Sequence, residues 1–288
     1  MEIIRSSRNA AIRRLLTLRN NRRRRAEGAV LVDGARETLR AIESGLTLRA
    51  FYEPVNASGD TLIDVDGIEA ARQHASEVGV HRGVSTELFA KICYGDAQQR
   101  CVAEFAATDD CVTNMGPPPP GVILVLDRVE KPGNIGAVFR TADAAGVAAV
   151  LLCDCPSDRF NSNAIRSSLG AVFTVPSGSG TQAEVNEYLS RYVDDVYSMR
   201  VEGASSFYDA DLRADRVAVI LGSEADGLGD RWLHFGQTTA ASQSDSSSLE
   251  NDSRLIQAVK LPMAGRVDSL NVSVSAAIVA FEAVRQRH

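Results

Sequence analysis

The sequence predicts an α/β protein with two domains, and three observations support this. Its 288 residues are about two domains' worth at roughly 100–200 residues each. Short apolar segments alternate with segments of helical spacing over most of the chain. Four consecutive prolines, Pro117 to Pro120, interrupt the alternation, because proline continues neither a helix nor a central strand.

The first predicted domain covers residues 1–108 and is a small α/β domain. Two apolar segments typical of strands alternate in it with two segments of helical spacing, and each helix ends at a glycine. The strands are expected at residues 29–33 and 49–52, and the helices at residues 35–44 and 68–78. Residues 109–120 (DDCVTNMGPPPP) then form a stiff, extended, proline-rich linker.

The second predicted domain covers residues 121–288. It opens with GVILVLD (residues 121–127), which is apolar on both faces, as in a covered parallel sheet. Further strands are expected at residues 147–153, 195–201 and 216–221, and helices at residues 134–145, 164–169, 182–192 and 272–287. This doubly wound pattern predicts a parallel sheet with helices on both faces, whose ligands bind beyond the carboxyl ends of its strands. The polar segment 236–253 is expected to be a flexible surface insertion.

Composition narrows the class of protein. With 44% apolar and 24% charged residues, the chain is neither a collagen, a coiled-coil rod nor a disordered protein. The longest apolar run, Ala144 to Cys153, is about half the length needed to span a bilayer, and charges interrupt the N-terminus where a signal peptide is apolar. The five cysteines are odd in number and lack CxxC pairs, which argues against a disulfide framework or a metal site. We expect a soluble, cytoplasmic protein without a bound metal.

Charge is distributed unevenly. Residues 1–28 contain nine arginines and two glutamates, a net charge of +7, so the other 260 residues carry −13 of the total of −6. Such a basic N-terminal arm is typical of phosphate binding, although a solvated helix face is the simpler explanation. The use of arginine alone favours RNA, because a guanidinium binds phosphate and stacks on bases. The RNA-binding candidates in this arm are Arg22, Arg23, Arg24 and Arg25.

Three glycine-containing segments follow or adjoin predicted strands. They are residues 131–142 (KPGNIGAVFRTA), 220–229 (ILGSEADGLG) and 261–274 (LPMAGRVDSLNVSV). Neither GxGxxG nor GxxxxGK[ST] occurs, which argues against a nucleotide-dependent oxidoreductase. In order and spacing, the three segments resemble the signature motifs of the SpoU (TrmH-like) RNA ribose 2′-O-methyltransferases of the SPOUT superfamily.

This resemblance covers residues 121–286 and implies a fold that composition does not show. The second domain would contain a deep trefoil knot, a rare exception to the usual topology rules, and the protein would be a homodimer with the active site near the interface. The first domain resembles, more loosely, the substrate-binding domain of the ribosomal-RNA members, which has a small ribosomal-protein fold. Its most similar segment is VLVDGARETLRAIESG, residues 30–45.

The resemblance also implies roles for individual residues. The implied catalytic-site residues are Asn134, Arg140, Glu224, Ser269 and Asn271. The implied contacts to S-adenosylmethionine are Gly222, Leu261 and Leu270, and Arg166 is a further candidate for RNA binding. Each polar residue also has a purely structural alternative, since Asn134, Glu224, Ser269 and Asn271 all lie where a helix start needs a cap.

The implied activity is S-adenosylmethionine-dependent methylation of a ribose 2′-hydroxyl, in 23S ribosomal RNA. Transfer RNA is the alternative substrate, and an inactive RNA-binding protein is the alternative from another class. Because a guanidinium stays protonated, we expect Arg140 to hold the adjoining phosphate and lower the effective pKa of the 2′-hydroxyl, without acting as the base itself. The sequence leaves open the modified nucleotide, the proton acceptor, a housekeeping or antibiotic-resistance role, and whether segment 236–253 gates the donor pocket.

Overall fold

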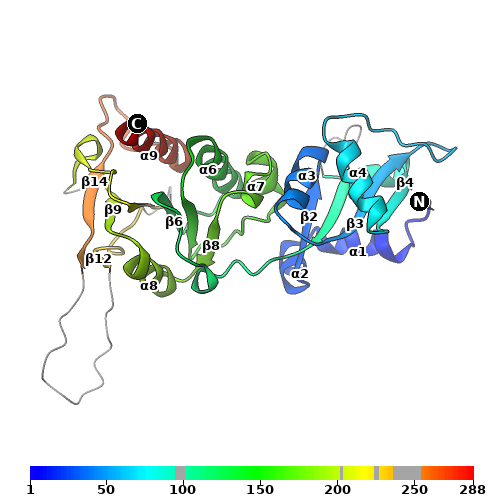
Figure 1. Cartoon of the computed structure of the whole chain (residues 1–288), viewed down its shortest axis with the longest axis horizontal. Helices are drawn as coiled ribbons and strands as arrows, with labels where there is room; N and C mark the ends of the chain where they lie inside the picture. The colour runs from blue at the N-terminus through cyan, green and yellow to red at the C-terminus, as the bar shows by residue number, and fades with distance from the viewer. Residues whose placement is uncertain (95–100, 202–203, 224–226, 236–253) are drawn as a thin grey trace, which may run out of the picture. The chain divides into compact units, whose positions relative to one another are not determined.

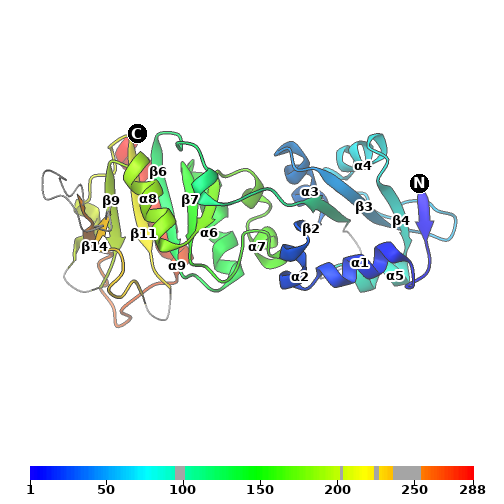
Figure 2. The same cartoon turned by 90° about the horizontal axis from the view of Figure 1, so that it is seen from below.

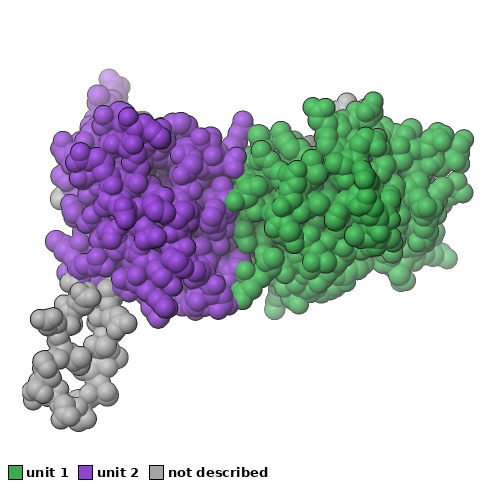
Figure 3. Space-filling model, in the orientation of Figure 1, with its two compact units in different colours: residues 1–109, 159–174 green, residues 110–158, 175–288 purple. Residues whose placement is uncertain are grey.

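Two sheets form the framework of the protein, one in each of two compact units (Figures 1 and 2). The computed structural model describes residues 1–94, 101–201, 204–223, 227–235 and 254–288. Unit 1 consists of residues 1–109 and 159–174, and unit 2 of residues 110–158 and 175–288 (Figure 3). No helix in these described ranges is both long enough and apolar enough to cross a membrane.

Unit 1 contains a mixed sheet of five strands in the order β1-β4-β3-β5-β2. Strand β4 runs parallel to β1 and β3, whereas β5 runs antiparallel to β3 and β2. The strands are β1 (Glu2–Ile4), β2 (Ala29–Asp33), β3 (Leu48–Val55), β4 (His81–Ser85) and β5 (Val102–Ala106). The helices are α1 (Ala10–Leu18), α2 (Asn21–Ala26), α3 (Ala35–Glu43), α4 (Ile68–Glu77), α5 (Thr86–Ile92) and α7 (Ser162–Ser167), with a short 3₁₀ helix, η2 (Ala171–Phe173).

Helix α1 shows how the sequence shapes this unit. The side chain of Asn9 accepts a hydrogen bond from the Ala11 backbone N–H at 2.8 Å and caps the helix. Ile12, Leu15 and Leu18 then recur at helical spacing and are buried in one apolar cluster with residues of the sheet and of α5. Helices α1 and α5 thus cover one face of the sheet, and α3 and α4 cover the other (Figure 2).

Unit 2 contains a sheet of seven strands in the order β10-β14-β9-β11-β6-β7-β8, and every neighbouring pair is parallel. Its strands are β6 (Gly121–Asp127), β7 (Ala149–Cys153), β8 (Ser177–Gly180), β9 (Asp195–Met199), β10 (Ser205–Ser206), β11 (Arg216–Leu221) and β14 (Gln257–Lys260). A separate antiparallel pair is formed by β12 (His234–Phe235) and β13 (Arg254–Leu255). The helices are α6 (Pro132–Ala145), α8 (Gln182–Tyr192) and α9 (Val272–Arg287), with 3₁₀ helices η1 (Val112–Asn114) and η3 (Phe207–Asp209).

Helices cover both faces of this parallel sheet, as the sequence predicts. Helices α6 and α9 lie side by side on one face, and α8 lies on the other (Figure 1). The strands predicted at residues 121–127 and 216–221 and the helix predicted at residues 182–192 are confirmed with the same bounds. Because all seven strands are parallel, their carboxyl ends meet at one edge of the sheet.

The proline-rich segment 109–120 is in contact with unit 2 along most of its length. Val112 is fully buried in the apolar core of that unit. The backbone carbonyl of Gly116 accepts a hydrogen bond from the Tyr188 hydroxyl at 3.0 Å, and that of Pro118 accepts one from Arg216 Nε at 2.8 Å. Residues 110–120 are therefore part of unit 2 rather than a free spacer.

Residues 159–174 follow β7 in the sequence but have most of their contacts in unit 1. The Tyr94 hydroxyl donates a hydrogen bond to Asn163 Oδ1 at 2.8 Å, and Arg40 Nη1 donates one to the Leu169 carbonyl at 3.2 Å. Gly170, which has a φ of +88°, lies so close to α3 that an added Cβ would be 3.3 Å from the Glu37 Cα atom. Unit 1 is therefore built from two separate stretches of the chain.

Candidate active site

The candidate active site lies at the carboxyl edge of the unit 2 sheet. Each of the three motif segments begins where a strand of this sheet ends: the first after β6, the second at the end of β11 and the third after β14. Strands β6 and β11 are neighbours in the sheet, although they are far apart in the sequence. From β6 the chain proceeds to β7 and β8 on one side, whereas β9 and β11 lie on the other. Ligands of parallel sheets bind at such a switch point.

Asn134 and Asn271 meet at this edge. Asn134 lies in the first turn of α6, which begins with Pro132 at its first position. Asn271 is the N-cap of α9: its Oδ1 atom accepts hydrogen bonds from the backbone N–H of Ser273 at 2.9 Å and from the Ser273 hydroxyl at 2.6 Å. Its Nδ2 atom donates to Asn134 Oδ1 at 3.3 Å. Asn271 therefore caps a helix and also connects the first and third motifs.

Among the described residues, the other catalytic candidates make no hydrogen bond with this pair. Arg140 is exposed on α6, and its side chain makes no hydrogen bond or ion pair with the described residues. Ser269 is also exposed, in the segment before α9. Glu224 lies outside the described residues. Of the four catalytic candidates that the structure describes, Asn134 and Asn271 are thus brought together, and the Arg140 guanidinium is available to a ligand.

In the second motif, Ser223 and Gly227 are paired with each other. The Gly227 backbone N–H donates to the Ser223 carbonyl at 3.1 Å, and the two residues form an isolated antiparallel bridge. A Cβ atom added to Gly222 would lie 2.4 Å from the carbonyl carbon of Gly227. Gly222 is therefore required by the close approach of the Gly227 backbone.

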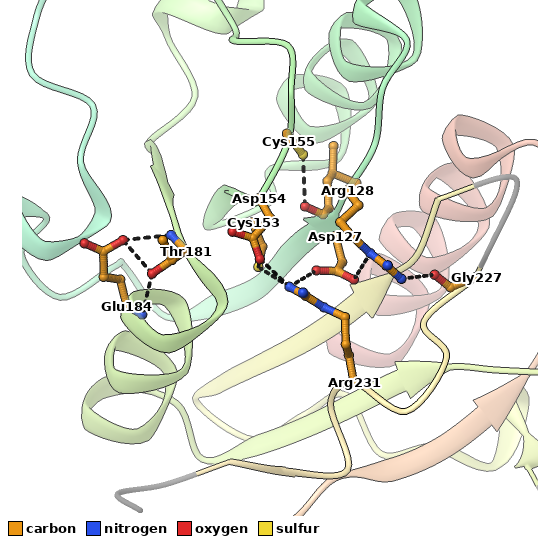
Figure 4. A network of polar contacts seen from close by, with 10 residues as sticks. Asp127, Arg128, Cys153, Asp154, Cys155, Thr181, Glu184, Gly227 and Arg231 are labelled. Atoms are coloured by element: carbon orange, nitrogen blue, oxygen red, sulfur yellow. Dashed lines mark hydrogen bonds and ion pairs between the residues drawn. The ribbon is translucent and has the colours of Figure 1, made fainter.

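A polar network, which the sequence does not single out, connects Gly227 to the ends of β6 and β7 (Figure 4). The fully buried carboxylate of Asp127 accepts a hydrogen bond from Arg231 Nη2 at 2.9 Å and lies 3.4 Å from Arg128 Nε. Arg231 also donates to Asp154, and Arg128 donates to the Gly227 carbonyl at 3.3 Å. The two arginines therefore join the strand ends to the segment that follows the second motif.

The backbone around this network is unusual. Arg128 has a φ of 54° and Asp154 a φ of 48°, both in the left-handed region that residues with side chains seldom occupy. Such conformations persist where the surrounding contacts hold them, and they are common at functional sites. Here the contacts are the ion pairs of Arg231 with Asp127 and Asp154.

The same network includes the one group of possible metal ligands found in the described part of the chain, Asp127, Cys153 and Asp154. Arg231 donates to all three side chains, so a guanidinium already supplies the positive charge among them. Burial, assisted by the nearby Asp127 carboxylate, raises the pKa of the Cys153 thiol, which disfavours the thiolate that a metal would require. Despite the opposing effect of burial, Asp154 and Asp127 raise the pKa of Arg231. The cluster fits an internal ion pair better than a metal site.

Comparison with known proteins identifies the family. The model of the SpoU rRNA Methylase family matches residues 121–240. A 23S rRNA (guanosine-2′-O-)-methyltransferase of Xylella fastidiosa (strain 9a5c) is 34% identical over an alignment of 241 residues. The alignment covers 78% of this chain and 84% of that protein. The chain belongs to the SpoU rRNA methylase family. The family predicted from the three motifs is therefore confirmed.

Other SpoU methylases support the assignment over nearly the whole chain. A 23S rRNA (guanosine-2′-O-)-methyltransferase of Pseudomonas putida is 32% identical over 231 residues, covering 80% of this chain and 81% of that protein. A solved RNA 2′-O ribose methyltransferase is 30% identical, with a TM-score of 0.75 and 99% of both chains covered. The fold is also that of the rRNA methyltransferase from Sinorhizobium meliloti, solved with S-adenosylmethionine, at 21% identity and a TM-score of 0.79, covering 99% of this chain and 97% of that one.

The predicted basic arm of this SpoU methylase is folded. Its arginines lie largely on α1 and α2, and two of them form internal ion pairs: Arg14 with Glu104 at 2.7 Å and Arg19 with Asp33 at 2.6 Å. Arg24 is only 2% exposed and donates to the Ala29 carbonyl at 3.3 Å, so the prediction that it binds RNA is wrong.

The remaining candidates for RNA binding keep accessible side chains. Arg22, Arg23 and Arg25 are exposed, as expected for the outward face of a helix whose inward face holds Arg24. Arg166 is exposed on α7 and lines a cleft of about 770 Å³ within unit 1, together with Arg36. The candidates for RNA binding therefore belong to unit 1, and the candidate catalytic residues belong to unit 2.

Proposed function

We propose that this SpoU methylase transfers the methyl group of S-adenosylmethionine to the 2′-hydroxyl of a guanosine in 23S ribosomal RNA. The observation that carries the proposal is the hydrogen bond between Asn134 and Asn271, which joins the first and third motifs at the carboxyl edge of a parallel sheet. Relatives that are 32–34% identical over about four-fifths of the chain have this activity in their names. The guanosine and the 23S substrate come from those relatives.

The residues at the sheet edge fit the methyl donor. Gly222 follows the central strand β11, where its lack of a side chain lets backbone approach closely. Leu261 is 9% exposed and Leu270 is half-buried, so both offer apolar surface near the third motif. When bound, S-adenosylmethionine supplies a methyl group already activated on a sulfonium. The protein's own task is therefore to position the ribose and to accommodate one proton.

Arg140 is the residue we assign to that task. Its guanidinium is exposed and makes no ion pair with the described residues, so it is available to the phosphate next to the target ribose. Arginine stays protonated in proteins and cannot accept the 2′-hydroxyl proton. A fixed positive charge beside the hydroxyl stabilises the oxyanion that develops there and lowers the effective pKa of the hydroxyl. Asn134, held by Asn271, fixes the start of the helix that carries Arg140.

Transfer of tritiated methyl from S-adenosylmethionine to unmodified 23S ribosomal RNA tests the proposal, with bulk transfer RNA measured in parallel. Label should appear on guanosine ribose of the ribosomal RNA, and Arg140→Ala should lower the rate by about 10²–10³-fold. Arg140→Lys should retain part of the activity with a shifted pH profile. Arg213→Ala removes an arginine whose side chain is 69% exposed and serves as the control.

Three outcomes would contradict parts of this proposal. Label on transfer RNA alone would replace the substrate and leave the chemistry in place. Donor binding without transfer to either RNA or to ribosomal particles would favour an RNA-binding protein without catalysis. Equal loss of activity in Arg140→Lys and Arg140→Ala would show that the fork geometry of the guanidinium, and not its charge alone, is needed.

We also propose that the protein is a homodimer that works in the cytoplasm. Helix α9 exposes Val274 (46%) and Phe281 (52%), two apolar residues seven positions apart and thus on one face. A second copy of the chain would cover this face. The five cysteines are free, as is typical of a reducing compartment. Light scattering should give a dimer mass for the native protein and a monomer mass for Phe281→Asp; a native monomer would refute the dimer.

A further inference from the structure

Unit 1 contains a cleft of about 570 Å³ between α1 and the sheet. Ile4, Ala10, Ala11 and Ala50 give it apolar walls. Its polar lining includes three arginines and two glutamates, a formal net charge of +1: Arg14, Arg49, Arg82, Glu2 and Glu104. The cleft is separate from the candidate active site, which consists of unit 2 residues.

A β-bulge turns Arg49 toward this cleft. In the pairing of β3 with β5, Leu48 lies opposite Phe105 and Ala50 lies opposite Glu104, so Arg49 is the extra residue. In a regular strand Arg49 and Ala50 would point to opposite faces of the sheet. The bulge places Arg49 on the same face of the sheet as Ala50. The distance of 3.8 Å from Arg49 Nη1 to Glu104 Oε1 shows this placement. Arg49 is therefore on the cleft side, with its side chain still 39% exposed.

Arg82 and Tyr52 are neighbours on adjacent strands and form the second part of the cleft. Arg82 Nη1 donates to the Tyr52 hydroxyl at 3.2 Å. Tyr52 is 1% exposed, and burial raises the pKa of its hydroxyl, which therefore stays protonated. A phenol that accepts one hydrogen bond still has its own proton to donate. Arg82 approaches one acidic residue, Glu2, at 3.7 Å, and that glutamate side chain is 63% exposed.

Arg14 has a different role in the cleft. Its Nε and Nη2 atoms donate to the buried carboxylate of Glu104, and its Nη1 atom donates to Glu27. These donors are used within the protein, and they neutralise Glu104 beneath the cleft. Among the residues that the structure describes, Arg49 and Arg82, in contrast, have only long contacts to carboxylates, at 3.8 and 3.7 Å. Their guanidinium donors and the Tyr52 hydroxyl can therefore converge on an external acceptor.

We propose that this cleft binds one phosphodiester of the RNA substrate through Arg49, Arg82 and the Tyr52 hydroxyl. Two guanidinium groups and a hydroxyl donor match the tetrahedral, acceptor-rich oxygens of a phosphate. The proposal rests on the proposed function for the identity of the RNA. The cleft anchors RNA at a point remote in sequence from the methyl-transfer residues and contributes to affinity rather than to the chemical step.

The test is the salt dependence of RNA binding by the full-length protein, with an unmodified 23S ribosomal RNA fragment as the probe. Arg49→Ala/Arg82→Ala should weaken binding about tenfold and lower the slope of log K against log salt by about 0.7–0.9, the loss of one phosphate contact. KM for RNA should rise by a similar factor, whereas kcat should stay within about twofold. Arg49→Lys/Arg82→Lys should restore most of the slope.

Two further variants separate this site from a general loss of charge or packing. Lys91→Ala/Arg213→Ala removes two exposed charges elsewhere and should leave the slope within error of wild type. Tyr52→Phe keeps the aromatic ring and removes only the hydroxyl, and should weaken binding about threefold. Arg14→Ala is unsuitable because it would leave the buried Glu104 without its main partner.

An unchanged slope and affinity in Arg49→Ala/Arg82→Ala would overturn the proposal. A second result would also overturn it: inorganic phosphate raises the Tm of the wild type but not of the variant, and the variant binds RNA as tightly as the wild type does. The cleft would then be a site for free anions. Wild-type protein that binds RNA but transfers no methyl group would refute the proposed function alone, since the binding assay still reports on the cleft.

Discussion

The two sheets of this SpoU methylase differ in where they hold buried charge. In unit 1 two buried carboxylates lie inside strands: Glu53 in β3 and Glu104 in β5 are 0% and 3% exposed. In unit 2 the central strand β6 is apolar until its last residue, Asp127, which is also fully buried. Glu53 and Glu104 are therefore held inside the mixed sheet, whereas Asp127 lies at the edge of the parallel sheet where the motifs meet.

This difference has a physical basis. Glu53 accepts hydrogen bonds from Arg72 at 2.8 and 3.0 Å and contacts His81 Nε2 at 2.6 Å, so its charge is neutralised by side chains of its own unit. At the edge of unit 2, Asp127 is neutralised by Arg231, which comes from the segment following the second motif. Removing the arginine partner of Glu53 should therefore affect stability alone, whereas removing the arginine partner of Asp127 should affect both stability and activity.

The largest effect is expected for Arg231→Ala. This variant leaves Asp127 buried without one of its two arginines, which should lower the free energy of unfolding by about 3–5 kcal/mol. Because Arg231 also holds the segment after the second motif, affinity for S-adenosylmethionine and methyl transfer should both fall. Chemical denaturation and calorimetric titration of the donor provide the measurements. Normal donor binding in a destabilised variant would show that the network is only structural.

A smaller effect, confined to stability, is expected for Arg72→Ala. The Glu53 carboxylate keeps His81 as a partner, so the loss should be about 3 kcal/mol, at the lower end for a broken buried pair. Donor affinity and kcat should remain at wild-type values, because Arg72 and Glu53 both lie in unit 1. A fall in kcat at temperatures where the variant is folded would contradict the separation between the units.

The smallest effect is the dependence of this unit 1 interaction on pH. Burial opposes ionisation of Glu53, but its hydrogen bonds with His81 and Arg72 prevail and lower its pKa. A lowered pKa in the folded state stabilises the protein above the unfolded pKa, and that stabilisation is lost as pH falls through the folded value. The loss amounts to about 1.4 kcal/mol for each unit by which the pKa is lowered.

Comparing the wild type with Glu53→Gln from about pH 7 to about pH 3 should show this directly. The difference in free energy of unfolding between the two proteins should shrink as the pH decreases, because the wild-type carboxylate becomes protonated and resembles the amide. A difference that stays constant over this range would mean that the charge of Glu53 does not contribute.

The sequence predicts the apolar framework better than the polar strands. β6 and β11 are runs of Val, Ile and Leu and can be identified without a partner strand. The strands β4 (HRGVS) and β8 (SGSG) have no such apolar pattern and are not predicted from the sequence. They form strands because they pair with β3 and β7, and this pairing replaces the strand preference that their own residues lack. Helix spacing likewise predicts α3, α4 and α8 from their apolar faces.

Some residues of the candidate active site can likewise be predicted from the sequence, and others cannot. The pairing of Asn134 with Asn271 follows from the motifs, although the two residues are 137 positions apart. The contact of Arg231 with Asp127 spans 104 positions, and no local pattern points to it. A run of four arginines does not show that Arg24 points inward, because that depends on which face of α2 packs against the unit. The catalytic roles of all five residues, Asn134, Arg140, Glu224, Ser269 and Asn271, stay predictions.

The return of residues 159–174 to unit 1 constrains how the protein can be made. A ribosome releases the chain from its N-terminus, so residues 1–109 emerge first, followed by β6 and β7, and only then by the last piece of unit 1. Unit 1 is therefore still incomplete when β6 and β7 of the second sheet have already been synthesised. Cutting the gene at residue 110 would give two fragments. The first would lack the apolar segment containing Phe160, Ile165 and Val172, and the second would contain this segment without the rest of unit 1. The two units are therefore not two consecutive pieces of the chain, and unit 1 can be completed only after part of unit 2 has been synthesised.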